Sequence, residues 1–357
     1  MIEFEILARG LFRPNRLTIT YNPTLTMPTT GTTPDPALTT PAIGITHVGA
    51  ARCAQFIAPS PNETTPQGIT TNSPLHTPPT IQQWMDTLWQ QKLTLAQQKN
   101  IPLYNTPLYR LIHAKTQPNG NPVYCRGDLH GHPRVRGGGH PAPVLHLTLG
   151  NTTYKEYVTT REPAFAHNRP REELSNALSV CSVVETTDRY ILLDKRQGVD
   201  VYAGRYHVIG GFFERDLDTT ETTETTETTE TIETSATSAT NPDPFAAIRR
   251  EIREETGIQT ADIAEQYCLG VLYDLATPHA ELCFLTRLNI PLNEVRQRVP
   301  EENEIKQLLP LYVTEESLRN FILTNHGNIS ATGEPNLLLY GALNFGEAWF
   351  EEIMGRL

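Results

Sequence analysis

The residues best suited to chemistry lie in one run, Arg250 to Ile258, which reads Arg-Glu-Ile-Arg-Glu-Glu-Thr-Gly-Ile. In a helix, spacings of three and four residues place Glu251, Glu254 and Glu255 on one face. Like charges stacked in this way destabilise an isolated helix by roughly a few tenths of a kcal/mol per pair. A cluster that costs stability favours a bound hard cation, because Mg²⁺ or Mn²⁺ takes oxygen ligands from carboxylates, waters and phosphates.

The alternative interpretation of this run is a solvated helix face. Arg249, Arg250 and Arg253 are interspersed with the glutamates and could pair with them as surface ion pairs. Charge runs on helices usually have this explanation, so the run needs support from the residues around it.

The elements on either side of the run would position it. Asp243 and Pro244 have the residue types of an N-cap and first helical position, and Gly257 suits a left-handed helix end. These signals predict a helix of normal length between them. Upstream, a strand over 207–213 contains Gly210 and Gly211, where the missing side chains let the backbone turn tightly and approach the site.

Residues 1–170 are predicted to form an N-terminal α+β unit. Alternation over 1–22 predicts two strands, and a helical stripe predicts a helix over 81–99. Two strand-like segments follow at 109–113 and 144–149. Between the first strands and the helix, residues 23–80 are rich in Thr and Pro and are expected to be an excursion without regular structure.

Residues 171–357 are predicted to form a second unit, with the boundary near 165–175. Residues 219–240 hold a Thr-Thr-Glu repeat with almost no apolar surface to bury, so a solvated, passive loop is expected there. The other expected elements are two strands joined by a turn within 176–193, strands 268–275 and 281–288, and helices 314–323 and 336–354.

The glycines and the glutamate run together resemble the Nudix box, G-x5-E-x7-R-E-U-x-E-E-x-G-U, where U is aliphatic. Every specified position of the second half is matched by Arg250 to Ile258. Gly211 to Ile258 spans 48 positions, whereas the pattern has 23, so about 25 residues are inserted. Counting from Gly211 puts Leu217 where the family has its first Glu. Either Asp216 or Asp218 replaces that Glu, or its role is lost in this chain.

This resemblance implies an α/β fold, the Nudix α/β/α sandwich with a mixed sheet, and a hydrolase that cleaves a nucleoside diphosphate linked to another group. The catalytic and metal-binding residues that it implies are Glu251, Glu254 and Glu255 as ligands of Mg²⁺ (or Mn²⁺), Arg250 as the residue that orients a glutamate, Gly210 and Gly211 in the loop, and Glu302 or Glu304 as general base. Glu301 lies in the same acidic loop as the last two.

A wider similarity suggests the substrate. Trp84-x4-Trp89-x2-Lys92, Pro107-Leu-Tyr-Arg-Leu111 and Leu149-Gly-Asn-Thr-Thr-Tyr-Lys155 resemble the UDP-glucose/UDP-galactose diphosphatase branch of the superfamily. That branch produces UMP and a sugar 1-phosphate. The alternatives are a Nudix diphosphatase for ADP-ribose or another nucleoside diphosphate derivative, and a non-catalytic module that binds a nucleotide sugar.

Composition excludes several other classes. The formal net charge of −11 disfavours a nucleic-acid binder, which would show a basic face. Five scattered cysteines without a CxxC pair indicate neither a disulfide framework nor a zinc ribbon. With no apolar run of about 18 residues and no secretory signal pattern, we expect a cytoplasmic protein with a small-molecule partner and no membrane contact.

Two further clusters have competing interpretations. Cys125, His130, His132 and His140 could be a zinc site, but a polar Gly/His/Arg loop is favoured. In the same loop, Arg134, Arg136 and 137–139 could cradle a phosphate, although a surface loop is again favoured because no strand-to-helix context follows. Trp84 and Trp89 are five residues apart, so at most one of them is expected to face a core.

Overall fold

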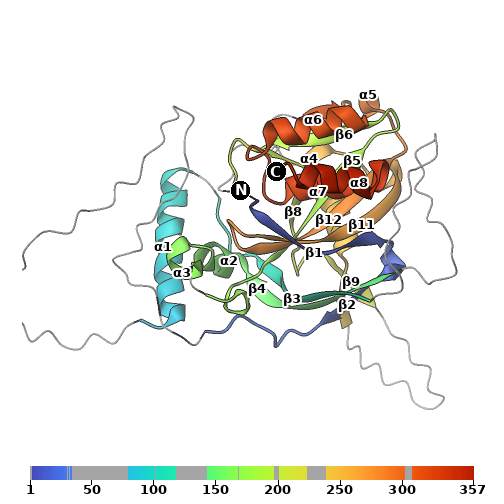
Figure 1. Ribbon diagram of the computed structural model, residues 1–357. Coiled ribbons are helices and arrows are strands. Elements are labelled where there is room, and N and C mark those ends of the chain that lie inside the picture. Colours follow the sequence, from blue (N-terminus) through green and yellow to red (C-terminus); the bar gives the residue numbers. More distant parts are fainter. Residues whose placement is uncertain are drawn as a thin grey trace, which may run out of the picture.

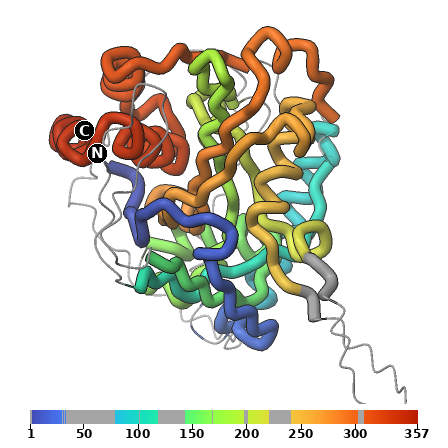
Figure 2. Tube along the Cα trace, turned by 90° about the vertical axis from the view of Figure 1, so that its right-hand side faces the viewer, coloured from blue at the N-terminus to red at the C-terminus, as the bar shows by residue number. Residues whose placement is uncertain are grey.

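The computed structural model describes residues 2–29, 31, 33, 79–100, 102–117, 143–167, 169–196, 201–222, 239–301 and 308–357. Its two termini lie side by side (Figures 1 and 2). Within those ranges no helix is both long enough and apolar enough to cross a membrane.

An eight-stranded mixed sheet forms the centre of the molecule (Figure 1). Its main order is β1-β11-β12-β5-β6-β13, with β7 paired to β6 and β8 paired to β5. Only β12 and β5 pair in parallel, and the other described neighbours are antiparallel. The bounds of these strands are β1 Phe4–Phe12, β5 Leu178–Glu185, β6 Tyr190–Lys195, β7 Tyr206–His207, β8 Ile209–Phe212, β11 Ile263–Asp274, β12 His279–Leu288 and β13 Leu308–Tyr312.

Helices cover both faces of this sheet. One face packs against α6 (Glu315–Asn325), α7 (Gly333–Phe345) and α8 (Glu347–Met354), and the other face packs against α4 (Pro244–Thr256). Buried apolar side chains fill both contacts, and burial of this kind is the main favourable term in folding. The predicted α/β class, with a mixed sheet between helical layers, is confirmed. Short helical segments η1 (Pro14–Arg16), η3 (Arg171–Glu173), η4 (Thr260–Asp262) and α5 (Leu292–Val295) connect the main elements.

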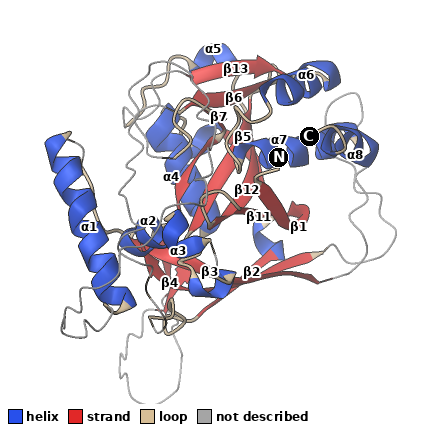
Figure 3. Cartoon of the chain, turned by 60° about the vertical axis from the view of Figure 1, so that its left-hand side comes forward, coloured by secondary structure: helices blue, strands red, loops and turns tan. Residues whose placement is uncertain are grey.

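A smaller three-stranded sheet, ordered β2-β4-β3, lies on the α4 side of the main sheet (Figure 3). Its strands are β2 (Leu17–Tyr21), β3 (Pro107–Gln117) and β4 (Val144–Thr153), and beside it lie α1 (Ile81–Gln98), α2 (Tyr154–Thr160) and α3 (Pro163–Ala166). The first strand, β1, pairs with β11 and so belongs to the main sheet. A division of the chain near residue 170 remains a prediction, and β1 crosses it.

The helix that carries the glutamates begins and ends where the sequence predicts. The Asp243 side chain accepts hydrogen bonds from the backbone N–H groups of Phe245 (2.9 Å) and Ala246 (3.0 Å), and Pro244 occupies the first turn. Gly257 ends the helix with φ 74°, and its N–H donates to the Arg253 carbonyl. The left-handed conformation favours glycine at this position.

Two expectations are corrected. The helix expected over 336–354 is two helices, because Gly346 has φ 97° and interrupts the helical backbone. Trp84 and Trp89 are both buried, whereas the sequence predicted at most one. Trp84 stacks on Phe165, and Trp89 packs edge-on against Tyr154. Helix α1 lies between two separate apolar clusters, so both of its sides are covered.

The low-complexity insertion leaves and re-enters the fold at one point. Its described ends form a two-stranded ribbon, β9 (Thr219–Thr222) with β10 (Ala239–Pro242). At the base of the ribbon, the Asp243 N–H donates to the Asp218 carbonyl at 3.0 Å. The chain on either side is therefore held together independently of what lies between the two strands.

Candidate active site

The glutamate face of α4 lies against the glycine pair of β8. A Cβ atom added to Gly211 would lie 2.5 Å from the carboxyl atoms of Glu251, and any side chain there would displace this carboxyl group. The Gly210 N–H donates to Glu255 Oε2 at 3.3 Å. The missing side chain of Gly211 thus leaves room for the Glu251 carboxyl group, whereas a Cβ on Gly210 would meet Val180 and Cys181 of β5. Two carboxyl groups of the helix therefore lie close to one strand.

Arg250 holds the acidic groups together. Its Nη1 lies 2.9 Å from Glu251 Oε1 and donates to Glu254 Oε2 at 2.9 Å, while Nη2 donates to the Phe212 carbonyl. Burial lowers the pKa of Arg250, but its hydrogen bonds to Asp218 and the nearby carboxylates outweigh this effect, so the pKa is raised overall. The guanidinium therefore stays charged and fixes the orientation of the carboxylates around it.

Asp218 is the acidic residue that anchors Arg250. Its two carboxylate oxygens accept hydrogen bonds from Arg250 Nε and Nη2, both at 2.9 Å. The side chain of Asp218 is 1% exposed, whereas Asp216 is exposed and Leu217 is 59% exposed. The sequence left Asp216 and Asp218 as alternatives, and the geometry selects Asp218 as the partner of this arginine.

Glu251 carries an electrostatic cost in this position. Glu251 is 9% exposed, and burial, together with Glu254 and Asp218, raises its pKa to about 8, despite the opposing effect of Arg250. A hard cation suits this donor set, since carboxylate oxygens are its preferred ligands and positive charge would favour ionised Glu251. Within the described ranges, no three acidic, histidine or cysteine side chains form a preassembled metal cluster.

The acidic loop that was predicted to supply a general base begins near the end of α4. Glu301 Oε1 lies 3.0 Å from Arg253 Nε. Gly257 lies tightly against the backbone of Val299, because an added Cβ would be 2.4 Å from the Val299 carbonyl oxygen. Glu302 and Glu304 lie outside the described residues, and their role stays a prediction.

The two other clusters, for which a polar surface loop was the favoured interpretation, also fall outside the described residues. These are Cys125, His130, His132 and His140, weighed as a zinc site, and Arg134, Arg136 and 137–139, weighed as a phosphate loop.

The sequence did not single out one acidic residue that lies beside the site. Glu214 is half-buried on the loop after β8, and its backbone N–H donates to Asp218 Oδ2 at 2.9 Å. Burial raises the pKa of Glu214, and Asp218 and Glu254 add to this effect. The available signal was its position, three residues after Gly211 in a short stretch that also contains Asp216 and Asp218.

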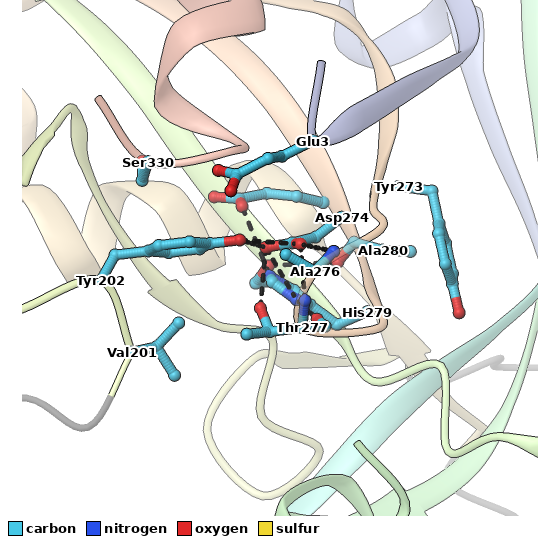
Figure 4. Close-up of polar contacts among 12 residues, drawn as sticks. Glu3, Val201, Tyr202, Tyr273, Asp274, Ala276, Thr277, His279, Ala280 and Ser330 are labelled. Atoms are coloured by element: carbon cyan, nitrogen blue, oxygen red, sulfur yellow. Dashed lines mark hydrogen bonds and ion pairs between the residues drawn. The ribbon is translucent and has the colours of Figure 1, made fainter. Parts of the chain in front are cut away.

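A second buried polar cluster surrounds Asp274 at the turn between β11 and β12 (Figure 4). Asp274 accepts hydrogen bonds from the Tyr202 hydroxyl, the Ala276 and Thr277 N–H groups and the Thr277 hydroxyl, at 2.8–2.9 Å. These donors satisfy the carboxylate, so the cluster fixes the turn and the loop that carries Tyr202.

This cluster continues through buried charges on β12. His279 Nε2 lies 3.7 Å from Glu281 Oε2, and His207 Nε2 lies 3.9 Å from Glu281 Oε1. Burial alone would raise the pKa of Glu281, but the two histidines outweigh it and the pKa falls to about 2. Burial lowers the pKa of His207 to about 3. Because these groups are buried and paired, we assign them to the stability of the sheet.

No protein-family model matches the chain, and no curated protein matches it. Among solved structures, one likeness is to a bifunctional NMN adenylyltransferase/ADP ribose pyrophosphatase from Francisella tularensis, complexed with AMP and a manganese ion. The identity is 15% and the TM-score 0.29, covering 48% of this chain and 42% of that chain. The chain thus spans less than half of that protein.

Two shorter proteins show a similar degree of likeness. The MutT protein from Methanosarcina mazei Go1 is 17% identical with a TM-score of 0.27, covering 50% of this chain and 92% of that chain. A putative nudix hydrolase family member from Chromobacterium violaceum is 18% identical with a TM-score of 0.27, covering 50% and 86%. Because these identities and scores are low, the proposal of a function has to rest on the geometry of the site itself.

Proposed function

We propose that this protein is a Nudix-type, divalent-metal-dependent hydrolase of a nucleoside diphosphate linked to another group. The observation that carries the proposal is that Glu251 and Glu255 lie against the backbone of Gly210 and Gly211. Beside them, Arg250 contacts Glu251 and is held by the buried Asp218. A solvated face of a charged helix would not place a carboxyl group against a strand backbone and bury it there.

The residues divide the work as follows. Glu251, Glu254 and Glu255 would hold Mg²⁺ or Mn²⁺, which when bound neutralises phosphate charge and lowers the pKa of water. Arg250 orients Glu251 and Glu254 through Nη1. The general base is proposed to come from the loop of Glu302 and Glu304, whose first residue already contacts α4 through Arg253.

The finer proposal for the substrate is UDP-glucose or UDP-galactose, split into UMP and a sugar 1-phosphate. It is supported by the sequence motifs of the N-terminal unit and by the insertion between the halves of the glutamate motif. Trp84 and Trp89 of these motifs are packing residues, so they support a shared architecture more strongly than a shared substrate. ADP-ribose is the alternative within the same chemistry.

Purified protein should be incubated with UDP-glucose, UDP-galactose and ADP-ribose in the presence of Mg²⁺, with products separated and identified. Formation of UMP and sugar 1-phosphate supports the full proposal. If AMP forms from ADP-ribose and neither UDP-sugar is cleaved, ADP-ribose replaces the UDP-sugars as the proposed substrate. Ligand-induced thermal stabilisation without turnover of any compound would instead indicate a non-catalytic binding module.

A further inference from the structure

The N-terminal part of β3 is hydrogen-bonded to the loop that follows the glycine pair. The Tyr109 N–H donates to the Phe213 carbonyl at 3.1 Å, and the Arg215 N–H donates to the Pro107 carbonyl at 3.0 Å. These two bonds flank an antiparallel bridge between Leu108 and Glu214. The loop from Gly211 to the anchor Asp218 is therefore paired with a strand of the smaller sheet.

The same edge of β3 also pairs with the segment that leads into β5. The Leu111 N–H donates to the Asn176 carbonyl at 2.9 Å, next to a bridge between Arg110 and Ala177. Residues two apart on a strand present their N–H groups to the same side. Tyr109 and Leu111 thus join the active-site loop and the start of β5 to one edge, while the other edge of β3 pairs with β4.

Arg110 fixes this segment of β3. Its guanidinium is buried and donates to four backbone carbonyl oxygens, those of Thr26, Glu172, Leu174 and Ser175, at 2.6–3.2 Å. A planar group with five donors can serve several carbonyls at once, whereas a lysine ammonium cannot reproduce this arrangement. The contact of residues 107–111 with residues 213–215 is called the joint below. The Tyr109 ring packs on Phe213 with 4.4 Å between centroids and adds an apolar contact to this joint.

We infer that residues 107–111 of β3 position the active-site loop, and that Arg110 is the positioning residue which holds them in place. The smaller sheet is therefore a structural part of the catalytic site rather than an appended module. The loop that β3 holds contains Asp218, which anchors Arg250, and Arg250 in turn orients Glu251 and Glu254. For its catalytic consequence this inference rests on the proposed function.

The test uses the full-length chain with Arg110→Met, and Lys115→Met as the matched control. Lys115 is a basic residue on the same strand, but it is exposed and lies beyond the joint. We expect Arg110→Met, assayed well below its Tm, to lose at least about tenfold in kcat and to need more Mg²⁺ for half-activation, with a smaller change in KM. Amide hydrogen exchange at 213–215 should rise at least about tenfold more than exchange in β11 and β12.

Uniformly raised exchange, or unchanged kcat and Mg²⁺ dependence, would overturn the positioning role. If Arg110→Met does not fold, Arg110→Lys is used, and exchange in the wild-type chain gives a second measurement. In the wild-type chain, the Tyr109 and Arg215 amides should exchange through the same opening. Exchange of the Arg215 amide more than about a hundredfold faster than that of the Tyr109 amide would overturn the inference. Exchange needs no substrate, so a protein without hydrolase activity but with coupled exchange refutes the proposed function and leaves the joint supported.

Discussion

Replacing Asp218 with alanine removes the anchor of Arg250. Asp218 is 1% exposed and Arg250 is 12% exposed at the side chain, and two hydrogen bonds of 2.9 Å join them. Breaking one side of a buried ion pair costs about 3–5 kcal/mol, because a charge is left buried without its partner. Arg250 keeps its contacts with Glu251 and Glu254, so we expect the lower end, about 3 kcal/mol.

For a chain of this size, such a loss corresponds to a Tm lower by roughly 4 °C. We also expect hydrolysis to fall by at least about tenfold, because the freed guanidinium no longer orients the glutamates. The matched control is Asp216→Ala, which removes the same charge from the same loop at an exposed position and should change stability by less than about 0.5 kcal/mol.

Thermal denaturation of both variants, with activity measured well below their Tm, decides the matter. Equal effects of the two substitutions, or an Asp218→Ala protein with wild-type stability and rate, would refute the assignment of Asp218 as the anchor.

Three further predictions follow from the same geometry. Replacing residues 219–242 with Asn-Gly should leave the rate within a few-fold, because the Asp218 carbonyl and Asp243 N–H already form the i to i+3 bond of a tight turn; a collapse in rate would show that the insertion takes part in the site. Glu251→Gln should abolish activity but raise the Tm above that of the wild type at pH 8, with metal removed by a chelator. With a folded pKa of about 8, Glu251 costs stability as the pH rises from about 4.5 through 8. An equal Tm of the two proteins at pH 8 would contradict the burial argument. Glu281, with a folded pKa of about 2, contributes stability above about pH 4.5 that is lost as the pH falls towards 2, so Glu281→Gln should flatten the acid side of a Tm profile, and an unchanged profile would contradict this.

The parts of the fold that the sequence predicts are those encoded by short-range signals. Helix α4 has a capping aspartate, a proline in the first turn and a terminal glycine, so its bounds can be read from neighbouring residues. Two short apolar runs joined by a turn likewise reveal β5 and β6. The break at Gly346 was missed because apolar periodicity continues across it, although a glycine is the same kind of local signal that marks the end of α4.

The parts that the sequence does not reveal depend on contacts between distant residues. Asp216 and Asp218 are equivalent by composition, and the choice between them follows from a bond across 32 positions to Arg250. The placement of β1 beside β11 and the joint between Tyr109 and Phe213 likewise have no local signal. The burial of both tryptophans of α1 requires two separate packing partners, which helical periodicity alone cannot supply.

The most direct test of the glutamate site compares the wild-type chain with Glu255→Gln in hydrolysis of UDP-glucose with Mg²⁺. Glu255 accepts the Gly210 N–H, and glutamine keeps the size of the side chain while removing a charged oxygen ligand. The account predicts UMP and glucose 1-phosphate from the wild type and a rate lower by several orders of magnitude from the variant. Equal rates from the two proteins, or no hydrolysis of any nucleoside diphosphate derivative by the wild type, would contradict it.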